Sequence, residues 1–371
     1  MNSNEYNQTL AGMANDFRLH TVAMPCLPSK PNEFRSYAAR FSELEIWDEL
    51  DFVYLPCGDG LAQCLGAKSR LPGQSRLRSL LQRCEALIFG GRFGYTNGWL
   101  RRIRSWISAY SLNASAWGSL FHLDPYQYEF LSRNSAWKLM PDPVSHFDNI
   151  SATEARKQLQ LPANGLCFGM TGWIEKSKGA DMMLEAFAMA SDQLPKDSFL
   201  LLAGPVCDGL GIEAAQRYSS LIENRRIIIL DQLFPEKSMR MLLQAMDFVC
   251  LPYRRSTQSA SIFVKAVAHR RPVIATNSGW MERTTKLLEN GWLCQLGDVS
   301  SLADKMIEAA TSSKDCWDLS SGKINRFLEY HATENFQATW TTCIRKVMGV
   351  PNSNALRSWN WVLDARQDGR L

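Results

Sequence analysis

The sequence has no pair of cysteines with the spacing of a metal or redox site. Its 10 cysteines are scattered through 371 residues, none forms a Cys-x-x-Cys pair, and none stands near a histidine at the spacing of zinc ligands. Cys167 and Cys250 lie inside apolar runs, where a free thiol behaves as a small hydrophobic side chain. We therefore expect no metal site, and the free thiols suit a reducing cytoplasm.

Long apolar runs and a strong excess of one charge are also missing. No window approaches the roughly 18 uninterrupted apolar residues of a membrane-spanning helix, and the polar start Met1–Glu5 does not resemble a signal peptide. With 41 lysines and arginines against 37 acidic residues, the net charge is +4, which does not by itself indicate nucleic acid as a partner. We expect a cytoplasmic protein that binds no nucleic acid.

Length and composition indicate two ordinary globular domains. A chain of 371 residues with 46% hydrophobic and 21% charged residues is too long for a typical single domain. The cluster Pro141-Asp142-Pro143 favours a boundary close behind it. We predict a first domain over 1–145, a second over 146–345 and a tail over 346–371.

Strand and helix patterns alternate clearly in the second half, which predicts a parallel sheet with helices on both faces. The expected strands are 166–171, 198–203, 226–230, 248–251 and 273–275. The expected helices are 152–160, 180–190, 213–223, 236–246, 260–268, 300–310 and 333–348.

The first half is less regular but is also predicted to be α/β. Its expected strands are 17–24, 51–55, 86–89 and 120–123, and its expected helices are 6–17 and 99–110.

The stretch from Leu251 to Ala275 predicts an anion site. It is expected to run as strand, polar loop, helix, tight turn and strand. Ligands bind outside the carboxyl ends of the strands in such sheets, and the N-terminus of a helix offers free N–H groups to an anion. The loop contains Arg254, whose guanidinium suits phosphate, and Gln258, Ser259 and Ser261, which can donate hydrogen bonds or cap the helix.

Several segments in consistent order resemble the retaining nucleotide-sugar glycosyltransferases of the GT-B fold, the group 1 or family 4 type. These segments are Gly172–Gly179, Leu184–Phe187, Leu202–Pro205, Asp247–Pro252, Pro272–Thr276 and Asn290–Leu293. The resemblance covers about residues 140 to 345. It implies two Rossmann-like parallel-sheet domains facing a cleft, with a nucleoside-diphosphate sugar bound by the second domain.

The resemblance also implies which residues bind the donor. Lys178 and the helix N-terminus would neutralise the leaving diphosphate. The donor site would comprise Gly172, Lys178, Gly179, Arg254, Gln258, Ser259, Ser261 and Lys265. Transfer would retain the anomeric configuration and need neither metal nor cofactor, and the sequence contains no Asp-x-Asp triplet.

Three departures from the family pattern leave a second interpretation open. Thr257 and Lys265 stand where the family has two glutamates, and Trp173 stands where it has a donor-binding arginine. The first strand and its glycine-rich loop are not recognisable before residue 6. An ammonium group cannot accept hydrogen bonds from sugar hydroxyls. The alternative is therefore a catalytically inactive GT-B pseudoenzyme that acts as a binding or scaffold partner.

The first domain offers two further candidate surfaces. His122 or Asp124, after an expected strand, would contact an acceptor hydroxyl, or both are structural. The Arg-rich region 92–107 has apolar residues at helical spacing, Trp99, Ile103, Trp106 and Ile107. It would rest on the inner face of an anionic membrane, near a lipid-linked acceptor, or else pack into the core. The expected acceptor is a glycan or a lipid-linked glycan.

Overall fold

The computed structural model describes residues 41, 50–55, 59–88, 99–145, 150–254, 259–312, 316–347, 349 and 356–363. The chain divides into two units. The first contains residues up to Asp142 together with Thr333–Trp359, and the second contains Pro143–Ala332 together with the residues from Asn360 on. The chain therefore leaves the first unit at Pro143 and returns to it at Thr333.

The second unit is built on a parallel sheet in which the described residues form six strands. These are β5 (Cys167–Thr171), β6 (Phe199–Ala203), β7 (Ile227–Leu230), β8 (Phe248–Leu251), β9 (Val273–Thr276) and β10 (Gly291–Cys294). Their order is β10-β9-β8-β5-β6-β7, and every neighbouring pair is parallel. From β5 the chain adds β6 and β7 on one side of the sheet, and then β8, β9 and β10 on the other side of β5. The strand order therefore reverses between β5 and β8.

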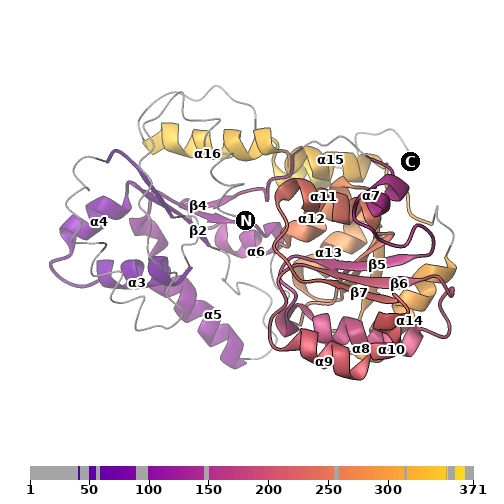
Figure 1. Cartoon of the computed structure of the whole chain (residues 1–371). Helices are drawn as coiled ribbons and strands as arrows, with labels where there is room; N and C mark the ends of the chain where they lie inside the picture. Colours follow the sequence, from indigo (N-terminus) through magenta and orange to yellow (C-terminus); the bar gives the residue numbers. More distant parts are fainter. Residues whose placement is uncertain are drawn as a thin grey trace. The chain divides into compact units, whose positions relative to one another are not determined.

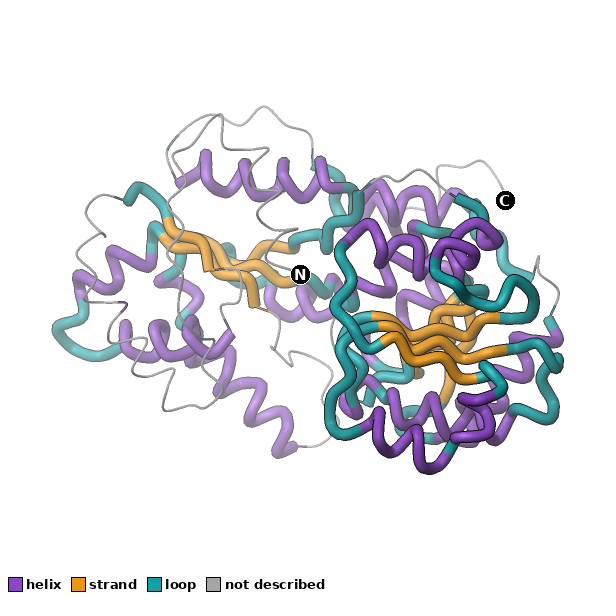
Figure 2. The backbone as a smooth tube through the Cα atoms, viewed as in Figure 1, coloured by secondary structure: helices purple, strands orange, loops and turns teal. Residues whose placement is uncertain are grey.

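Helices cover both faces of this sheet (Figures 1 and 2). One face carries α8 (Ala180–Ala190), α9 (Leu210–Arg217), α10 (Ser219–Glu223) and α14 (Val299–Thr311). The other carries α7 (Ala152–Gln158), α11 (Glu236–Ala245), α12 (Ser261–Ala268), α13 (Gly279–Leu288) and α15 (Gly322–Tyr330). This is the doubly wound arrangement that the strand and helix alternation predicted.

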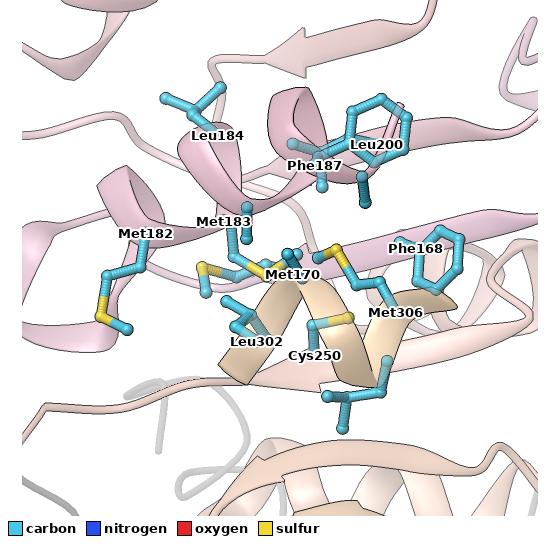
Figure 3. Packing of buried hydrophobic residues seen from close by; sticks show 14 of the residues in the cluster. Phe168, Met170, Met182, Met183, Leu184, Phe187, Leu200, Cys250, Leu302 and Met306 are labelled. Carbon is cyan, nitrogen blue, oxygen red and sulfur yellow. The ribbon is translucent and has the colours of Figure 1, made fainter. Parts of the chain in front are cut away.

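The largest core of the second unit lies between the sheet and the pair α8 and α14. Met170 and Phe168 from β5 meet Met183 and Phe187 from α8, with Met306 from α14 in the same cluster (Figure 3). All five side chains are fully buried. This packing holds α8, and with it the loop that joins β5 to α8, firmly on the sheet.

A buried arginine attaches α7 to the same sheet. The guanidinium of Arg156 donates to the carboxylate of Asp247, with an Nη2–Oδ2 distance of 2.6 Å, and to the carbonyl oxygens of Ala163, Gly165 and Ala245. The amide of Cys167 donates to the same carboxylate oxygen at 2.7 Å. Because the charge is paired and hydrogen-bonded, its burial is tolerated.

The first unit has a four-stranded parallel sheet in its described residues, of order β1-β2-β3-β4. The strands are β1 (Val53–Leu55), β2 (Cys84–Ile88), β3 (Ser119–His122) and β4 (Trp137–Leu139). The helices are α3 (Asp59–Ser69), α4 (Ser75–Leu81), α5 (Trp99–Leu112) and α6 (Pro125–Leu131). The predicted strands 51–55, 86–89 and 120–123 are found with shifted ends. Those predicted over 1–24 lie outside the described residues.

A late segment of the chain completes the first unit. Helix α16 (Thr333–Val347) buries Phe336, Trp340, Cys343 and Ile344 against a cluster that includes Phe121. Our predicted boundaries, with a contiguous second domain over 146–345, differ from this arrangement. The spacing of these apolar residues indicated a helix, but not which sheet it covers. A short helix, α17 (Trp359–Leu363), follows.

Most predicted elements of the second unit are found, and α8 has the predicted bounds. The helix predicted over 213–223 is instead two helices, because the backbone leaves the helical conformation at Tyr218. Strand β10 and helices α13 and α15 were not predicted. In the part of the chain that the structure describes, no helix combines the length and the apolar character needed to cross a bilayer.

Candidate functional site

The candidate site lies at the carboxyl ends of β5 and β8 in the second unit. The strand order reverses between these two strands, and the next α-helices along the chain, α8 and α12, lie on opposite faces of the sheet. Such a switch point is where open α/β sheets bind their ligands. The loops after β5 and β8 contain the residues that the sequence singled out.

Glycines shape the loop after β5. Gly172 and Gly179 have φ angles of +98° and +79°, a backbone region that other residues rarely adopt. Between them, Ile174 is buried and its amide donates to the carbonyl of Pro205 at 2.9 Å. A Cβ on Gly179 would overlap the carbonyl oxygen of Pro252, just after β8. The loop is therefore anchored on both sides and lies directly against the neighbouring loop.

The ammonium of Lys178 lies over Gly172. Its Nζ is 3.7 Å from the position that a Cβ on Gly172 would occupy. Burial lowers the pKa of Lys178, while Glu175 and Cys207 raise it. No hydrogen bond or ion pair to this ammonium is found among the described residues. Lys176, two residues earlier, differs because its Nζ pairs with Glu213 at 3.3 Å. Lys178 is thus a partly buried cation without a hydrogen-bonded counter-ion among the described residues.

Arg254 reaches this loop but already has a counter-ion. Its amide donates to the carbonyl of Ser177 at 3.1 Å, and its Nη2 donates to Asp181 Oδ2 at 2.7 Å. The sequence predicted that Arg254 would hold phosphate. In the structure it pairs with a carboxylate in the first turn of α8. Sequence reasoning missed Asp181, because this partner is 73 residues away.

Helix α12 presents its N-terminus on the same side. It begins at Ser261 after Ala260, and none of the described side chains caps it. Such an end offers N–H groups and a partial positive charge to an anion. Ser259 and Ser261 lie at this end, as expected. Gln258 and Thr257 lie outside the described residues.

Lys265 is neutralised within the protein. Its Nζ pairs with Glu236 Oε2 at 3.0 Å, and Arg240 Nε donates to the other oxygen of that carboxylate at 3.4 Å. The side chain of Lys265 is buried. Burial, with Arg271, Arg240 and Lys265, lowers the pKa of the neighbouring His269 to about 4. Sequence reasoning missed Glu236. The only available signal was an acidic residue after Pro235 at the start of a predicted helix.

The two acceptor-side candidates in the first unit make contacts within the fold. His122 and Asp124 are both buried. The Asp124 carboxylate caps α6 by accepting from the amides of Tyr126 and Gln127 at 2.8 and 3.1 Å. The amide of Asp124 in turn donates to His122 Nδ1 at 3.0 Å. Of the two interpretations that the sequence left open, the geometry therefore favours the capping role.

Unlike the buried His122 and Asp124, the apolar residues of the Arg-rich region 92–107 that the sequence singled out are exposed. Trp99, Ile103, Trp106 and Ile107 of α5 are all exposed, so the core-packed alternative is wrong for these residues. Separately, among the described residues no group of three or more histidine, cysteine, aspartate or glutamate side chains could hold a metal ion.

Comparison with known proteins adds a family and a fold. Residues 165–312, which lie within the second unit, match the family model "Glycosyl transferases group 1". No curated protein sequence matches the chain.

Solved structures of several glycosyltransferases share the architecture. Sucrose-phosphate synthase from Thermosynechococcus elongatus matches with a TM-score of 0.66 and 16% identity, over 94% of each chain. Anabaena HepE in complex with UDP and glucose matches with a TM-score of 0.59 and 16% identity, over 85% of this chain and 80% of that one. The lipopolysaccharide glycosyltransferase WaaG matches with a TM-score of 0.51 and 14% identity, over 80% of this chain and 98% of that one. At these identities the likeness shows the fold, which is GT-B.

Proposed function

Because residues 165–312 belong to the glycosyl transferases group 1 family, we propose that this protein transfers a sugar from a nucleoside-diphosphate sugar to an acceptor. The donor diphosphate would occupy the carboxyl edge of the second unit's sheet, between the loop after β5 and the start of α12. HepE was solved with UDP and glucose, which makes UDP-sugars the first donors to test.

The observation that carries this proposal is the environment of Lys178. Removing an ammonium from water costs free energy that a protein usually recovers with a counter-ion. Lys178 is partly buried, and this burial lowers its pKa more than the nearby Glu175 and Cys207 raise it. No hydrogen bond or ion pair to its ammonium is found among the described residues. A diphosphate supplies the missing negative charge. Lysine binds phosphate as a point charge, without the fork geometry of arginine.

The same geometry suggests how transfer would proceed. The bond between the anomeric carbon and a phosphate oxygen breaks, and its electron pair leaves with the nucleoside diphosphate. An acceptor hydroxyl oxygen forms the new bond to the anomeric carbon, and its proton passes to the departing phosphate oxygen. Lys178 and the α12 N-terminus stabilise that growing negative charge. Because these groups are fixed and positively polarised, we propose that transfer needs no metal. Retention of the anomeric configuration is proposed from the family resemblance, and a glycan or lipid-linked glycan is the proposed acceptor.

Calorimetry with UDP-, GDP- and ADP-sugars tests donor binding. We expect Lys178→Met to weaken binding of the preferred donor about 10- to 100-fold, the range for losing a hydrogen bond to a charged group. Lys176→Met is the matched control, because that lysine is paired with Glu213, and it should change binding little. If the wild-type protein binds none of these nucleotides and hydrolyses none of the donors, the proposal must be abandoned.

The ion pair between Lys265 and Glu236 favours a second candidate, a GT-B protein that binds a donor or a partner without catalysis. The buried Lys265 ammonium is already neutralised, and it offers no acceptor to a sugar hydroxyl. This candidate predicts capture of a partner glycosyltransferase together with neither transfer nor donor hydrolysis over long incubations. Detectable release of sugar from the preferred donor, lost in Lys178→Met, would exclude it.

A further inference from the structure

Helix α5 exposes one continuous apolar face. Trp99, Ile103, Trp106, Ile107 and Tyr110 are 70%, 45%, 66%, 50% and 52% exposed. Their spacing of four, three, one and three residues places all five on one side of an α-helix. Single exposed apolar residues need no explanation, but a gathered face is typical of an interaction site.

This face is not the one that attaches α5 to its own unit. Leu112 is fully buried, and Gly66 of α3 approaches the Leu112 carbonyl so closely that a Cβ there would overlap it. The Ser111 hydroxyl donates to the Ile107 carbonyl of the same helix at 2.8 Å. The helix is therefore held by α3 on one side and leaves its aromatic side uncovered.

Part of the exposed face is ordered by its own contacts. The rings of Trp106 and Tyr110 stack with centroids 5.4 Å apart. The Arg70 guanidinium lies 4.0 Å from the Tyr110 ring centroid and donates to the Tyr110 carbonyl at 3.0 Å. Rings fixed in this way lose little further freedom when they enter a new environment.

The charge of α5 indicates what covers the face. Among its 14 residues, Trp99–Leu112 include Arg101, Arg102 and Arg104 and no aspartate or glutamate. Tryptophan and tyrosine favour the boundary between water and lipid, because their rings are apolar with one polar atom. An aromatic face on a purely cationic helix is the pattern of helices that lie in the surface of an anionic membrane.

We propose that α5 docks onto the surface of an anionic phospholipid bilayer, with its apolar face at the boundary between headgroups and acyl chains. At 14 residues the helix is about 21 Å long, too short to span the roughly 30 Å hydrocarbon core, so it lies along the surface. A second copy is a poorer occupant, because a two-fold contact brings the same element of both chains together, and each α5 carries three arginines and no acidic residue. The inference rests on the proposed function and deepens it, since an enzyme held there reaches lipid-linked acceptors.

Flotation of the full chain with vesicles tests the docking. One vesicle population contains phosphatidylcholine alone, and the other contains phosphatidylcholine with phosphatidylglycerol. We expect binding to the anionic vesicles only, weakened by salt. Trp99→Ser with Trp106→Ser should reduce binding about tenfold or more for each residue, the cost of losing a buried large apolar side chain. Arg102→Gln and Arg104→Gln should each reduce it about fivefold.

Ile212→Ser is the matched control, because it removes a side chain that is also 70% exposed, from α9 of the second unit. It should leave flotation unchanged. The proposal is overturned if wild-type protein fails to float with anionic vesicles, or if the double tryptophan variant floats as well as wild type. It is also overturned if sedimentation shows that the wild-type protein is a dimer, that the double tryptophan variant is a monomer, and that anionic vesicles bind neither protein. Donor calorimetry on the same samples keeps the two proposals separable, since donor binding without flotation rejects only the docking.

Discussion

At the residue scale, the geometry of the candidate donor site depends on glycines in the loop after β5. Gly179 combines a φ of +79° with contact against the carbonyl of Pro252, so it both ends the 3-10 turn Lys176–Lys178 and allows the loop after β8 to approach. The position of the Lys178 ammonium follows from that turn. Any side chain at residue 179 therefore disturbs the cation as well as the backbone.

We predict that Gly179→Ala destabilises the second unit and weakens donor binding together. The left-handed backbone alone costs about 1–2 kcal/mol for a residue with a Cβ, and the overlap with Pro252 adds to it. Gly209→Ala separates the two costs, because Gly209 has a φ of +71° but open space around its Cβ position. Urea unfolding should show the smaller loss for Gly209→Ala, with donor affinity retained. Equal losses in both variants would mean that the contact with Pro252 does not matter.

The sequence predicts single residues of this site when the backbone itself carries the signal. Gly172 and Gly179 are recognisable because glycines bracket a lysine between a strand and a helix. The counter-ions are not recognisable, since Asp181 and Glu236 meet Arg254 and Lys265 across 73 and 29 residues. Whether a charged side chain is available to a ligand therefore depends on tertiary contacts that no local pattern contains.

At the element scale, the contact between β2 and α16 encloses a carboxyl group. Glu85 of β2 is fully buried, with the side chains of Ser119 and Trp340 beside its carboxyl group. Burial raises its pKa from 4.5 to about 8, and the nearby Ser119 and Trp340 lower it only in part. Glu85 is thus uncharged in the folded protein at neutral pH.

This group makes the first unit less stable as the pH rises. Between 4.5 and about 8 the unfolded state releases the Glu85 proton while the folded state keeps it, so the folded state loses stability across that window and stops losing it above. We expect Glu85→Gln to remove this dependence and to raise the free energy of unfolding near pH 8 by a few kcal/mol. Thermal unfolding of both proteins between pH 5 and 9 measures it. The pH dependence of the Glu85→Gln variant is subtracted from that of the wild-type protein. If the unfolding temperature of the wild-type protein is then no lower at pH 8 than at pH 5, the prediction is contradicted.

Helices and strands could be predicted from the sequence where a single local pattern of residues determines them. Helix α8 has its apolar residues on one face and follows a glycine, and its predicted ends are correct. The helix predicted over 213–223 is interrupted at Tyr218, where the backbone is not helical. The residue spacing continues across this position, so the sequence pattern did not reveal the break. Strand β10 contains only Gly291–Cys294, and its place is fixed by pairing with β9, which is a tertiary property.

At the scale of the whole molecule, the two units are not two consecutive halves of the sequence. The first unit takes its last helical layer from α16, which the chain reaches only after completing the second unit's sheet. Trp340 of this helix is buried. Its ring lies 5.0 Å from that of Tyr54, measured between centroids, within the cluster that contains Phe121 and Leu87. Sequence order alone could not assign α16, because it follows α15 (Gly322–Tyr330) of the second unit after only two residues.

A pair of tryptophan variants tests this interleaved construction. Trp340→Ala should cost about 3–5 kcal/mol by leaving a cavity, and the loss should fall on the first unit alone. Trp292→Ala removes a buried ring from the core of the second unit, so it should destabilise that unit by a similar amount and spare the first. Limited proteolysis during a urea titration, with the fragments identified by mass spectrometry, reports which unit opens in each variant. If α16 stabilised the second unit instead, Trp340→Ala would release cleavage sites within 150–254, and the assignment of this helix to the first unit would be wrong.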